Sequence, residues 1–196
     1  MQRLRLGDAL DFWKGSLLEV LRTASTPPSP LSVLPMFTDT GWTQPELATY
    51  AGFLGLPPSA LLTVTSQLTR PGRAHYFATI ANGFQGDVFL DPDNGITPRK
   101  PEPAHVAAAE VFALLTPENV VAVYQHRPQR VSAPWLVRYV QLVVATGARV
   151  VGYESAQVGM LFVTKSASRE SAVRQALANR LGAVAVARGS FAGRLI

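Results

Sequence analysis

Two carboxylates and an amide follow directly after a short apolar run in the middle of the chain. The run VFL at 88–90 leads into DPDNG at 91–95, which is typical of a buried strand that enters a sharp turn. In a parallel α/β sheet, ligands bind outside the carboxyl ends of the strands. Asp91, Asp93 and Asn94 are therefore candidate catalytic residues, as acceptors for a substrate amino group or as oxygen ligands for Mg²⁺. The alternative is a turn in which Asp and Asn bond their own backbone.

A second group of charged residues lies near the N-terminus. Asp8, Asp11 and Lys14 follow one another at intervals of three residues and would share one face of a helix. In a site, Lys14 would act as a catalytic residue and the two aspartates would bind substrate or cofactor. The alternative is an N-cap at Asp8 and an ion pair between Asp11 and Lys14.

Further polar residues follow two other predicted strands. Asp39 follows the run 31–37, and Tyr124 and His126 lie at the end of the run that begins at Asn119. These side chains should reach the same edge of the sheet as Asp91, where they would bind substrate or cofactor. His126 could serve as a proton shuttle or as a phosphate partner, and the alternative is an exposed loop histidine.

Positive charge is concentrated at the C-terminal end. The chain has 18 basic and 13 acidic residues, and the segment from Lys165 onward holds six of the basic residues against one acidic residue. A basic end on a neutral body indicates contact with a polyanion. The alternative is a solvated helix face. The residues predicted to contact nucleic acid are Arg127, Lys165, Arg169, Arg174 and Arg180.

Several classes of site are absent from the sequence. The chain has no cysteine, which excludes disulfides, thiolate metal sites and a cysteine nucleophile. It has no zinc-ligand spacing, no dinucleotide fingerprint, no phosphate-binding P-loop and no GxSxG elbow. It also lacks a signal-peptide pattern and a long uninterrupted apolar run. We therefore expect a cytoplasmic protein with no membrane partner.

Strand-like and helix-like segments alternate from residue 87 onward, which favours a parallel sheet with crossover helices. Two later runs, 149–154 and 158–164, are separated by only three residues, too few for a crossover, and should pair antiparallel. A chain of 196 residues that is 47% hydrophobic is long enough for one full core. The sequence therefore predicts a single α/β domain over 1–196, whose mostly parallel sheet ends in an antiparallel hairpin.

The boundaries of the elements follow from hydrophobic spacing and capping residues. An amphipathic helix at 9–22 precedes a proline-rich linker at 24–30. Ser168 is expected to cap the last helix and Gly182 to end it. The predicted strands are 31–37, 87–90, 119–124, 149–154 and 158–164. The predicted helices are 9–22, 43–54, 104–115, 133–146 and 168–181.

Two motifs carry a resemblance to known families. GDALDFWKGSLL at 7–18 and DVFLDPDNGI at 87–96, with VYQH at 123–126, resemble a family of uncharacterised bacterial proteins with GDxxDFxKxxLL and LDPDNG motifs. Both motifs are also similar to those of bacterial 23S rRNA adenine-N6 methyltransferases, which pair a GNxxDxxKH helix with a DPPY-like catalytic turn after their fourth strand. The resemblance covers these motifs and the order of elements from residue 87 onward. It implies a Rossmann-like class I methyltransferase sheet.

The same resemblance implies roles for individual residues. Asp91 would accept a hydrogen bond from the target amino group, so that the nitrogen lone pair can attack the methyl group of S-adenosylmethionine. Lys14 and Asp11 would match the lysine and aspartate of the N-terminal helix. The chain departs from the family at two places. Asp93-Asn94 replaces the Pro-Tyr whose aromatic ring would stack on a flipped base, and FTDTG at 37–41 replaces the glycine-rich turn after the first strand.

Three functions follow from these patterns. The first is a methyltransferase-like protein that methylates a base amino group in nucleic acid. The second is a Mg²⁺-dependent nuclease or hydrolase in which four aspartates converge on the metal. The third is a non-catalytic module that binds nucleic acid or protein on a decayed methyltransferase fold. The four aspartates are Asp8, Asp11, Asp91 and Asp93.

Overall fold

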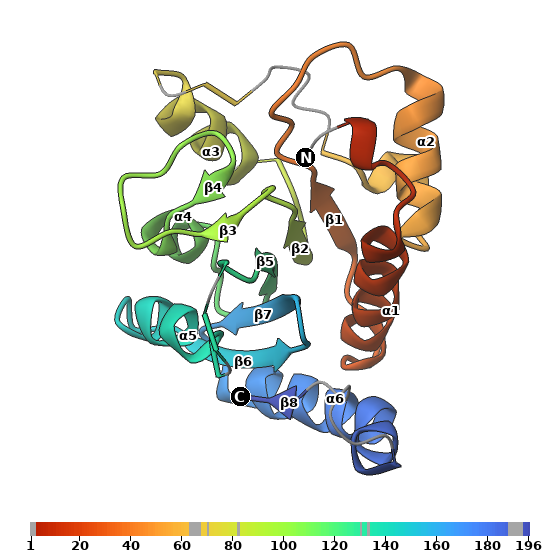
Figure 1. Ribbon diagram of the computed structural model, residues 1–196, viewed down its shortest axis with the longest axis vertical. Helices are drawn as coiled ribbons and strands as arrows, with labels where there is room; N and C mark the ends of the chain where they lie inside the picture. The colour runs from red at the N-terminus through yellow and green to blue at the C-terminus, as the bar shows by residue number, and fades with distance from the viewer. Residues whose placement is uncertain are drawn as a thin grey trace.

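A mixed six-stranded sheet forms the centre of the protein, in the order β1-β2-β5-β7-β6-β8 (Figure 1). The computed structural model describes residues 3–62, 68–69, 71–81, 83–129, 131–132, 134–187 and 194–196. β1, β2 and β5 pair in parallel, β7 pairs antiparallel with both β5 and β6, and β8 pairs antiparallel with β6. Four of these six strands therefore share one direction, and the sheet is mostly parallel. The strands are β1 (Leu31–Leu34), β2 (Asp87–Leu90), β5 (Val120–His126), β6 (Arg149–Glu154), β7 (Val158–Thr164) and β8 (Arg194–Leu195).

Helices cover both faces of this sheet (Figure 1). One face carries α1 (Ala9–Thr23), α2 (Gln44–Phe53) and α6 (Ala167–Ala187). The other carries α3 (Arg73–Ala81), α4 (Ala108–Ala113) and α5 (Val137–Val144). The protein is therefore a mixed α/β structure with a helical layer on each side of the sheet.

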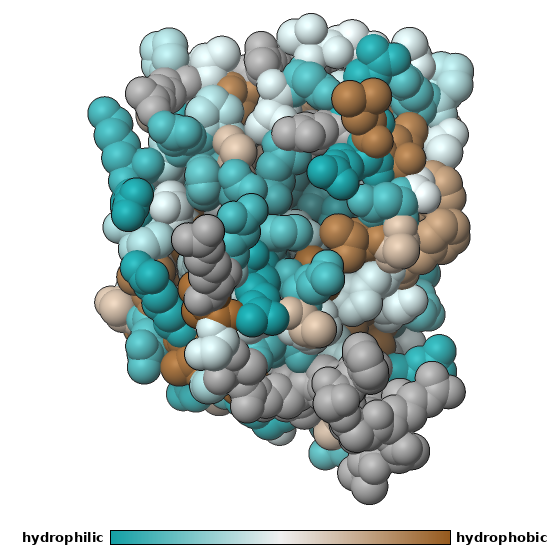
Figure 2. Space-filling model, viewed as in Figure 1, coloured by the Kyte–Doolittle hydropathy of each residue, from teal (hydrophilic) through white to brown (hydrophobic). Residues whose placement is uncertain are grey.

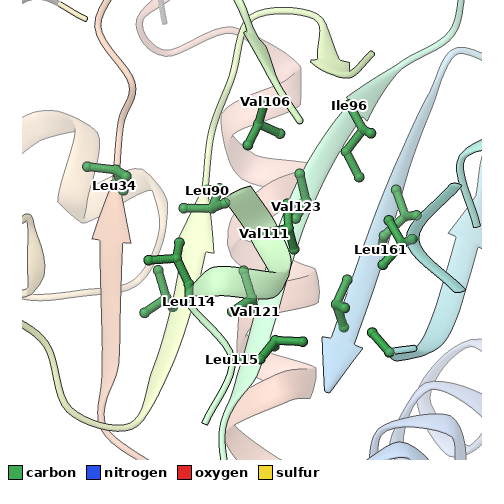
Figure 3. Close-up of a cluster of buried hydrophobic side chains, with 14 of the residues drawn as sticks. Leu34, Leu90, Ile96, Val106, Val111, Leu114, Leu115, Val121, Val123 and Leu161 are labelled. Atoms are coloured by element: carbon green, nitrogen blue, oxygen red, sulfur yellow. The ribbon is translucent and has the colours of Figure 1, made fainter. Parts of the chain in front are cut away.

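Alternate residues of the strands supply the two cores. Val121 and Val123 of β5 point into the core under α4 and α5, whereas Ala122 and Tyr124 point into the core under α1, as the two-residue period of a strand requires. Figure 3 shows the first of these cores, where Leu114 at the end of α4 lies near Leu90 and Val121. Burial on both faces explains why β5 is an almost continuous apolar run.

A small second sheet extends the turn after β2. It pairs β3 (Gly95–Ile96) in parallel with β4 (His105–Val106). Two short 3₁₀ helices, η1 (Arg3–Arg5) and η2 (Pro58–Ala60), complete the described elements. Hydrophilic side chains gather over the centre of the face seen in Figure 2, where β3 and β4 lie in Figure 1.

Most of the predicted elements are confirmed. The helix at 9–22 is α1, the strand at 87–90 is β2, and the runs 149–154 and 158–164 form the antiparallel hairpin β6–β7. The capping box is also present, since Thr43 Oγ1 accepts from the N–H of Glu46 and the Glu46 carboxylate accepts from the N–H of Thr43.

Several predicted boundaries are wrong. The strand expected at 31–37 ends at Leu34, and the helix expected at 133–146 spans Val137–Val144. The helix expected at 104–115 begins only at Ala108, because His105 and Val106 pair with β3 as a strand. The last helix is capped by Ser166 rather than Ser168, since the Ser166 hydroxyl accepts from the N–H of Arg169. That helix also continues through Gly182 to Ala187, although an interior glycine costs a helix about 1 kcal/mol relative to alanine.

Within the described residues, no helix is both long and apolar enough to cross a membrane.

Close approach of α1 and α2 depends on one glycine. A Cβ atom on Gly15 of α1 would lie 2.4 Å from the carbonyl oxygen of Phe53 and 3.2 Å from the Cα of Leu54. Only a residue without a Cβ lets the end of α2 reach this position. The absence of a side chain here therefore sets how near α2 lies to the residues of α1.

Gly15→Ala should destabilise the protein by about 1–3 kcal/mol, because the added methyl group forces the backbones of α1 and α2 apart. The matched control is Gly52→Ala in α2, where an added Cβ meets no atom within 4 Å. That substitution should stabilise the fold by up to about 1 kcal/mol through helix propensity. Urea denaturation of both variants measures the difference, and equal effects would contradict the role assigned to Gly15.

Candidate functional site

The turn after β2 is held in place by a buried glutamine of the neighbouring strand. Gln125 of β5 accepts from the N–H of Ile96 at 2.7 Å and donates to the carbonyl of Asn94 at 3.0 Å. Gly95 has a φ of +85°, and a Cβ there would lie 2.5 Å from the Gln125 amide. The turn at 91–95 therefore needs glycine for its conformation and for the approach of Gln125.

A buried lysine joins this turn to the N-terminal helix. Lys14 Nζ lies 2.9 Å from Asp91 Oδ2 and 3.1 Å from Asp11 Oδ1. The hydroxyl of Tyr50, from α2, donates to the same Asp91 oxygen at 2.7 Å. All four side chains are buried. The structure therefore brings Lys14 and Asp11 beside Asp91, as the two motifs predict, and adds Tyr50. We call these four residues the Lys14 cluster.

Charge compensation governs ionisation in the Lys14 cluster. Burial by itself would lower the pKa of Lys14, but the neighbouring Asp91 and Asp11 carboxylates outweigh it and raise that pKa above its ordinary value. Burial raises the pKa of Asp11 despite the opposing effect of Lys14. Burial and the Asp91 charge together raise the pKa of Tyr50 well above its ordinary value. At neutral pH Lys14 is therefore an ammonium and Tyr50 a neutral phenol, and both donate to Asp91.

A cavity of about 220 Å³ opens beside this cluster. Its wall contains four carboxylates and two basic side chains, which leaves an excess of negative charge and of hydrogen-bond acceptors. This acidic cavity suits a ligand that donates hydrogen bonds, such as one with an amino group. Its charged lining residues are Asp8, Asp11, Asp91, Asp93, Arg5 and Lys14.

The exposed part of the turn reaches into the acidic cavity. Asn94 is exposed, and its side-chain amide makes no hydrogen bond with any residue that the structure describes. The Asp93 carboxylate is half-buried and accepts from the Thr38 hydroxyl at 2.5 Å. Asp93 and Asn94 can therefore touch a ligand directly, whereas the buried Asp91 lies at the base of the cavity.

Two other predicted residues complete the wall of the acidic cavity. Tyr124 and His126 both line it, with the Tyr124 hydroxyl 3.1 Å from His126 Nδ1. The Lys14 ammonium lies 4.7 Å from the centre of the Tyr124 ring, a cation–π contact. Burial raises the pKa of Tyr124, so its phenol is neutral at physiological pH.

Two predicted binding residues have structural contacts of their own. Asp8 lines the acidic cavity and also caps α1, where it accepts from the N–H of Leu10 at 2.8 Å. Asp39 accepts from the Trp42 indole and from the N–H of Arg3. It lies in a neighbouring hollow with Asp93, outside the acidic cavity. The structure thus brings Asp8 to the site and leaves Asp39 beside it.

The basic residues of the last helix are not part of this site. β7 runs antiparallel to β5, so Thr164 lies beside Val120 at the opposite edge of the sheet from Asp91. Lys165 there donates to the carbonyl of Leu115, and Arg169 pairs with Asp87 at 2.5 Å. Farther along α6, the predicted contacts Arg174 and Arg180 are exposed. None of these four basic residues lines the acidic cavity.

Arg127 lies at the same edge of the sheet as the site, but its hydrogen bonds are already made. Its guanidinium donates to the backbone carbonyls of Val131 and Ala156, the latter at 2.8 Å. It therefore fixes the loop after β5 and contributes charge, with few donors left for a ligand.

Three residues of the site have no clear signature in the sequence. Tyr50 lies on a helix whose spacing does not distinguish it from core residues, and Arg5 lies in η1, ahead of the predicted helix. Gln125 carries a weak signal, because it is a polar residue inside the apolar run of β5. A buried amide beside a glycine turn is the pattern that would have identified it.

The site does not fit a magnesium ion. The Lys14 ammonium lies between Asp11 and Asp91, so it occupies the position where a cation would neutralise them. Among the described residues, no group of three or more His, Asp or Glu side chains is arranged to hold a metal.

The loop after β1 does not fit S-adenosylmethionine. Its own side chains fill it: the rings of Phe37 and Trp42 lie 4.6 Å apart, and buried Met36 has a φ of +49°. Glycines, which would let the backbone approach a cofactor, are missing from 35–40. The acidic cavity, about 220 Å³, is also smaller than the 300 Å³ or so of the smallest pockets for drug-sized ligands, so it can admit a single base but not a whole S-adenosylmethionine.

Comparisons with family models, with curated proteins and with solved structures find no match to this chain.

Lys14→Met should destabilise the protein by about 3–5 kcal/mol, because it leaves two buried carboxylates without a counter-charge. Lys100→Met is the control, since Lys100 is exposed and its replacement should change stability by no more than about 0.5 kcal/mol. Chemical denaturation near pH 7 gives both values. A loss below about 1 kcal/mol for Lys14→Met would contradict the role of the Lys14 cluster in folding.

Tyr50→Phe should change the response to alkaline pH. A phenol whose pKa is raised in the folded state stabilises the fold fully below its unfolded pKa of about 10, and this stabilisation is lost as pH rises above that value. The wild-type free energy of unfolding should therefore fall above about pH 10, and less steeply in Tyr50→Phe. At neutral pH the variant should lose about 1.5–3 kcal/mol, the cost of a hydrogen bond to a charged group. Identical alkaline slopes for the two proteins would contradict this assignment.

Proposed function

We propose that this chain is a nucleic-acid-binding protein on a Rossmann-like, methyltransferase-type fold, and that an amino-bearing base enters its acidic cavity. The observation that carries the proposal is the meeting of the Asp91–Asn94 turn with Lys14 and Asp11 of α1 around that cavity. In the methyltransferases whose motifs this chain resembles, the aspartate of the corresponding turn accepts a hydrogen bond from the target amino group, and the helix lies beside the active site.

The arrangement of the sheet supports the methyltransferase-type fold. The candidate turn lies at the carboxyl end of β2, between the parallel neighbours β1 and β5, the edge at which ligands of such sheets bind. The antiparallel hairpin β6–β7 follows in the chain, as the last two strands do in the methyltransferase sheet. These features support a common fold, and the function rests on the site.

The polar groups of the acidic cavity favour particular bases. A carboxylate such as Asp93 only accepts hydrogen bonds, and the Asn94 amide offers one acceptor and two donors. Adenine and cytosine carry an exocyclic amino group that donates to such acceptors, whereas thymine presents a carbonyl at the same place. We therefore infer a preference for adenine and cytosine over thymine or uracil.

We propose binding without methyl transfer. The loop after β1 is filled by its own side chains, and the Asp91 carboxylate is already bonded to Lys14 and Tyr50. A carboxylate with these partners is a poor acceptor for an incoming amino group, because the ligand would have to displace a buried contact. Asp93 and Asn94 are the residues that we expect to contact the base.

A short single-stranded DNA of abasic residues with one central adenine, cytosine or thymine tests the base preference. The wild-type protein should bind the adenine and cytosine probes about tenfold more tightly than the thymine probe, since one hydrogen bond to a charged group is worth about 1.5 kcal/mol or more. Asp93→Ala should abolish most of that preference. Fluorescence anisotropy measures all three affinities.

Glu118→Ala is the matched control, because it removes one negative charge from an exposed position just before β5. It should leave the base preference unchanged. Equal affinity of the wild-type protein for the three probes would refute base recognition at this site. Calorimetric titration with S-adenosylmethionine should show no binding, and saturable binding would overturn the conclusion that the fold acts without methyl transfer.

A further inference from the structure

A second cleft adjoins the acidic cavity and carries the opposite charge. It has a volume of about 530 Å³ and shares the residues Asn94 and His126 with the acidic cavity. Its wall holds four cationic side chains against one carboxylate, which gives an excess of three positive charges. The charged residues of this basic cleft are Arg99, Lys100, Arg127, Arg138 and Glu102.

We propose that the basic cleft is a phosphate-binding subsite for the backbone of a single-stranded nucleic acid. The base attached to that backbone would enter the acidic cavity, so the direction of the ligand rests on the proposed function, while phosphate binding itself does not. This assigns the phosphate contacts to residues of the β3–β4 loop and α5. The basic residues of α6 have no part in it.

Three of the four cations are available to a ligand. Arg99, Lys100 and Arg138 are exposed, and within the described part of the chain their side chains have no ion pair or hydrogen bond. Their donors therefore face solvent at the wall of the cleft, where a phosphate oxygen can accept from them. Arg127 differs, because its guanidinium already donates to the carbonyls of Val131 and Ala156.

The loop that carries Arg99 and Lys100 is held by backbone contacts at both ends. Asn94 N–H donates to the carbonyl of Ala104 at 2.9 Å, and Thr97 N–H donates to that of Val106 at 3.0 Å. Prolines at 98, 101 and 103 restrict the backbone between these points. The backbone that carries these two cations therefore loses little conformational freedom when a ligand binds, which favours affinity.

A buried arginine fastens the same loop to the helices beneath it. Arg73 of α3 donates to the carbonyl of Glu102 at 3.1 Å and to that of His105 at 2.6 Å. It also forms an ion pair with Glu110 of α4, whose carboxylate accepts from the N–H of Ala107 at 2.7 Å. The position of the loop is therefore set by the protein itself, before any ligand binds.

Opposite charges in the two concavities orient a ligand that spans them. The aspartates of the acidic cavity repel a phosphate, and the cations of the basic cleft attract it. Asn94 and His126 lie between the two regions, where the sugar that links base and phosphate would pass. A nucleotide matches this arrangement, because its phosphate is negatively charged and the amino group of an adenine or cytosine base donates hydrogen bonds.

A fully abasic single-stranded DNA tests the phosphate subsite without involving any base. The triple variant Arg99→Gln, Lys100→Gln and Arg138→Gln should bind it on the order of tenfold more weakly than the wild type. The slope of log affinity against log salt should fall by about 2, since each phosphate contact in a single strand contributes about 0.7. Fluorescence anisotropy over a range of salt concentrations gives both quantities.

The matched control is Arg149→Gln, Arg174→Gln and Arg180→Gln, which removes the same charge from exposed positions outside both concavities. It should bind the abasic strand within about twofold of the wild type. Equal weakening of the two triple variants would overturn the proposal, because general surface charge would then explain binding. Absence of wild-type binding would overturn it as well.

Asp93→Ala separates this inference from base recognition. That variant should bind the abasic strand as tightly as the wild type does, or more tightly, because it removes a negative charge from the neighbouring cavity. If Asp93→Ala loses the base preference but binds the abasic strand normally, the result supports the phosphate subsite. Thermal unfolding of each variant establishes that the fold is intact.

Discussion

The buried contact between the Lys14 ammonium and the Asp91 carboxylate determines how the rest of the structure is arranged. Removing such charges from water costs several kcal/mol for each ion, and only close, hydrogen-bonded geometry offsets that cost. The contact therefore requires α1 to lie against the carboxyl end of β2, and it requires the Tyr50 hydroxyl of α2 to complete the environment of the carboxylate. Gly15 meets this requirement, since its missing side chain lets α1 and α2 come together. The exposed residues of the turn are then presented at a fixed place.

Two concavities of opposite charge, the acidic cavity and the basic cleft, meet at this place. The boundary between them indicates how a ligand would be oriented. A uniformly basic surface would attract nucleic acid in any orientation. Here the carboxylates around Asp93 face the cations around Lys100 across Asn94 and His126, so attraction and repulsion act on different parts of one ligand. Charge complementarity of this kind determines orientation and specificity more than it adds to affinity. Under the proposed function, this arrangement suits selection of one nucleotide within a strand better than nonspecific binding of duplex.

Local sequence patterns predict the strands and the acidic part of the site well. The apolar run before Asp91 identifies β2, and the two motifs predict that Lys14 approaches a carboxylate 77 residues away. Local patterns do not predict elements that form only through contacts with residues distant in the sequence. The two-residue strand at His105 exists only because β3 lies beside it. The local sequence around it predicts a helix instead. The basic cleft is missed for a similar reason, since Arg99 and Lys100 lie in a proline-rich loop whose position depends on buried Arg73. The reversal of β7 starts α6 at the opposite edge of the sheet from Asp91, so the basic residues of that helix lie away from the acidic cavity.

The antiparallel direction of β7, which brings the start of α6 to Asp87, also affects how the chain folds during synthesis. Asp87, the first residue of β2, is buried, and its carboxylate is bonded to the N–H of Val120 and to Arg169 of α6, which lies 82 residues later in the chain. During synthesis, β2 leaves the ribosome long before its counter-charge does. Until α6 follows, the Asp87 carboxylate of a folded β2 would lack its ion pair with Arg169. The central sheet therefore cannot reach its full stability in the growing chain, and closure of the fold is coupled to the arrival of its last helix.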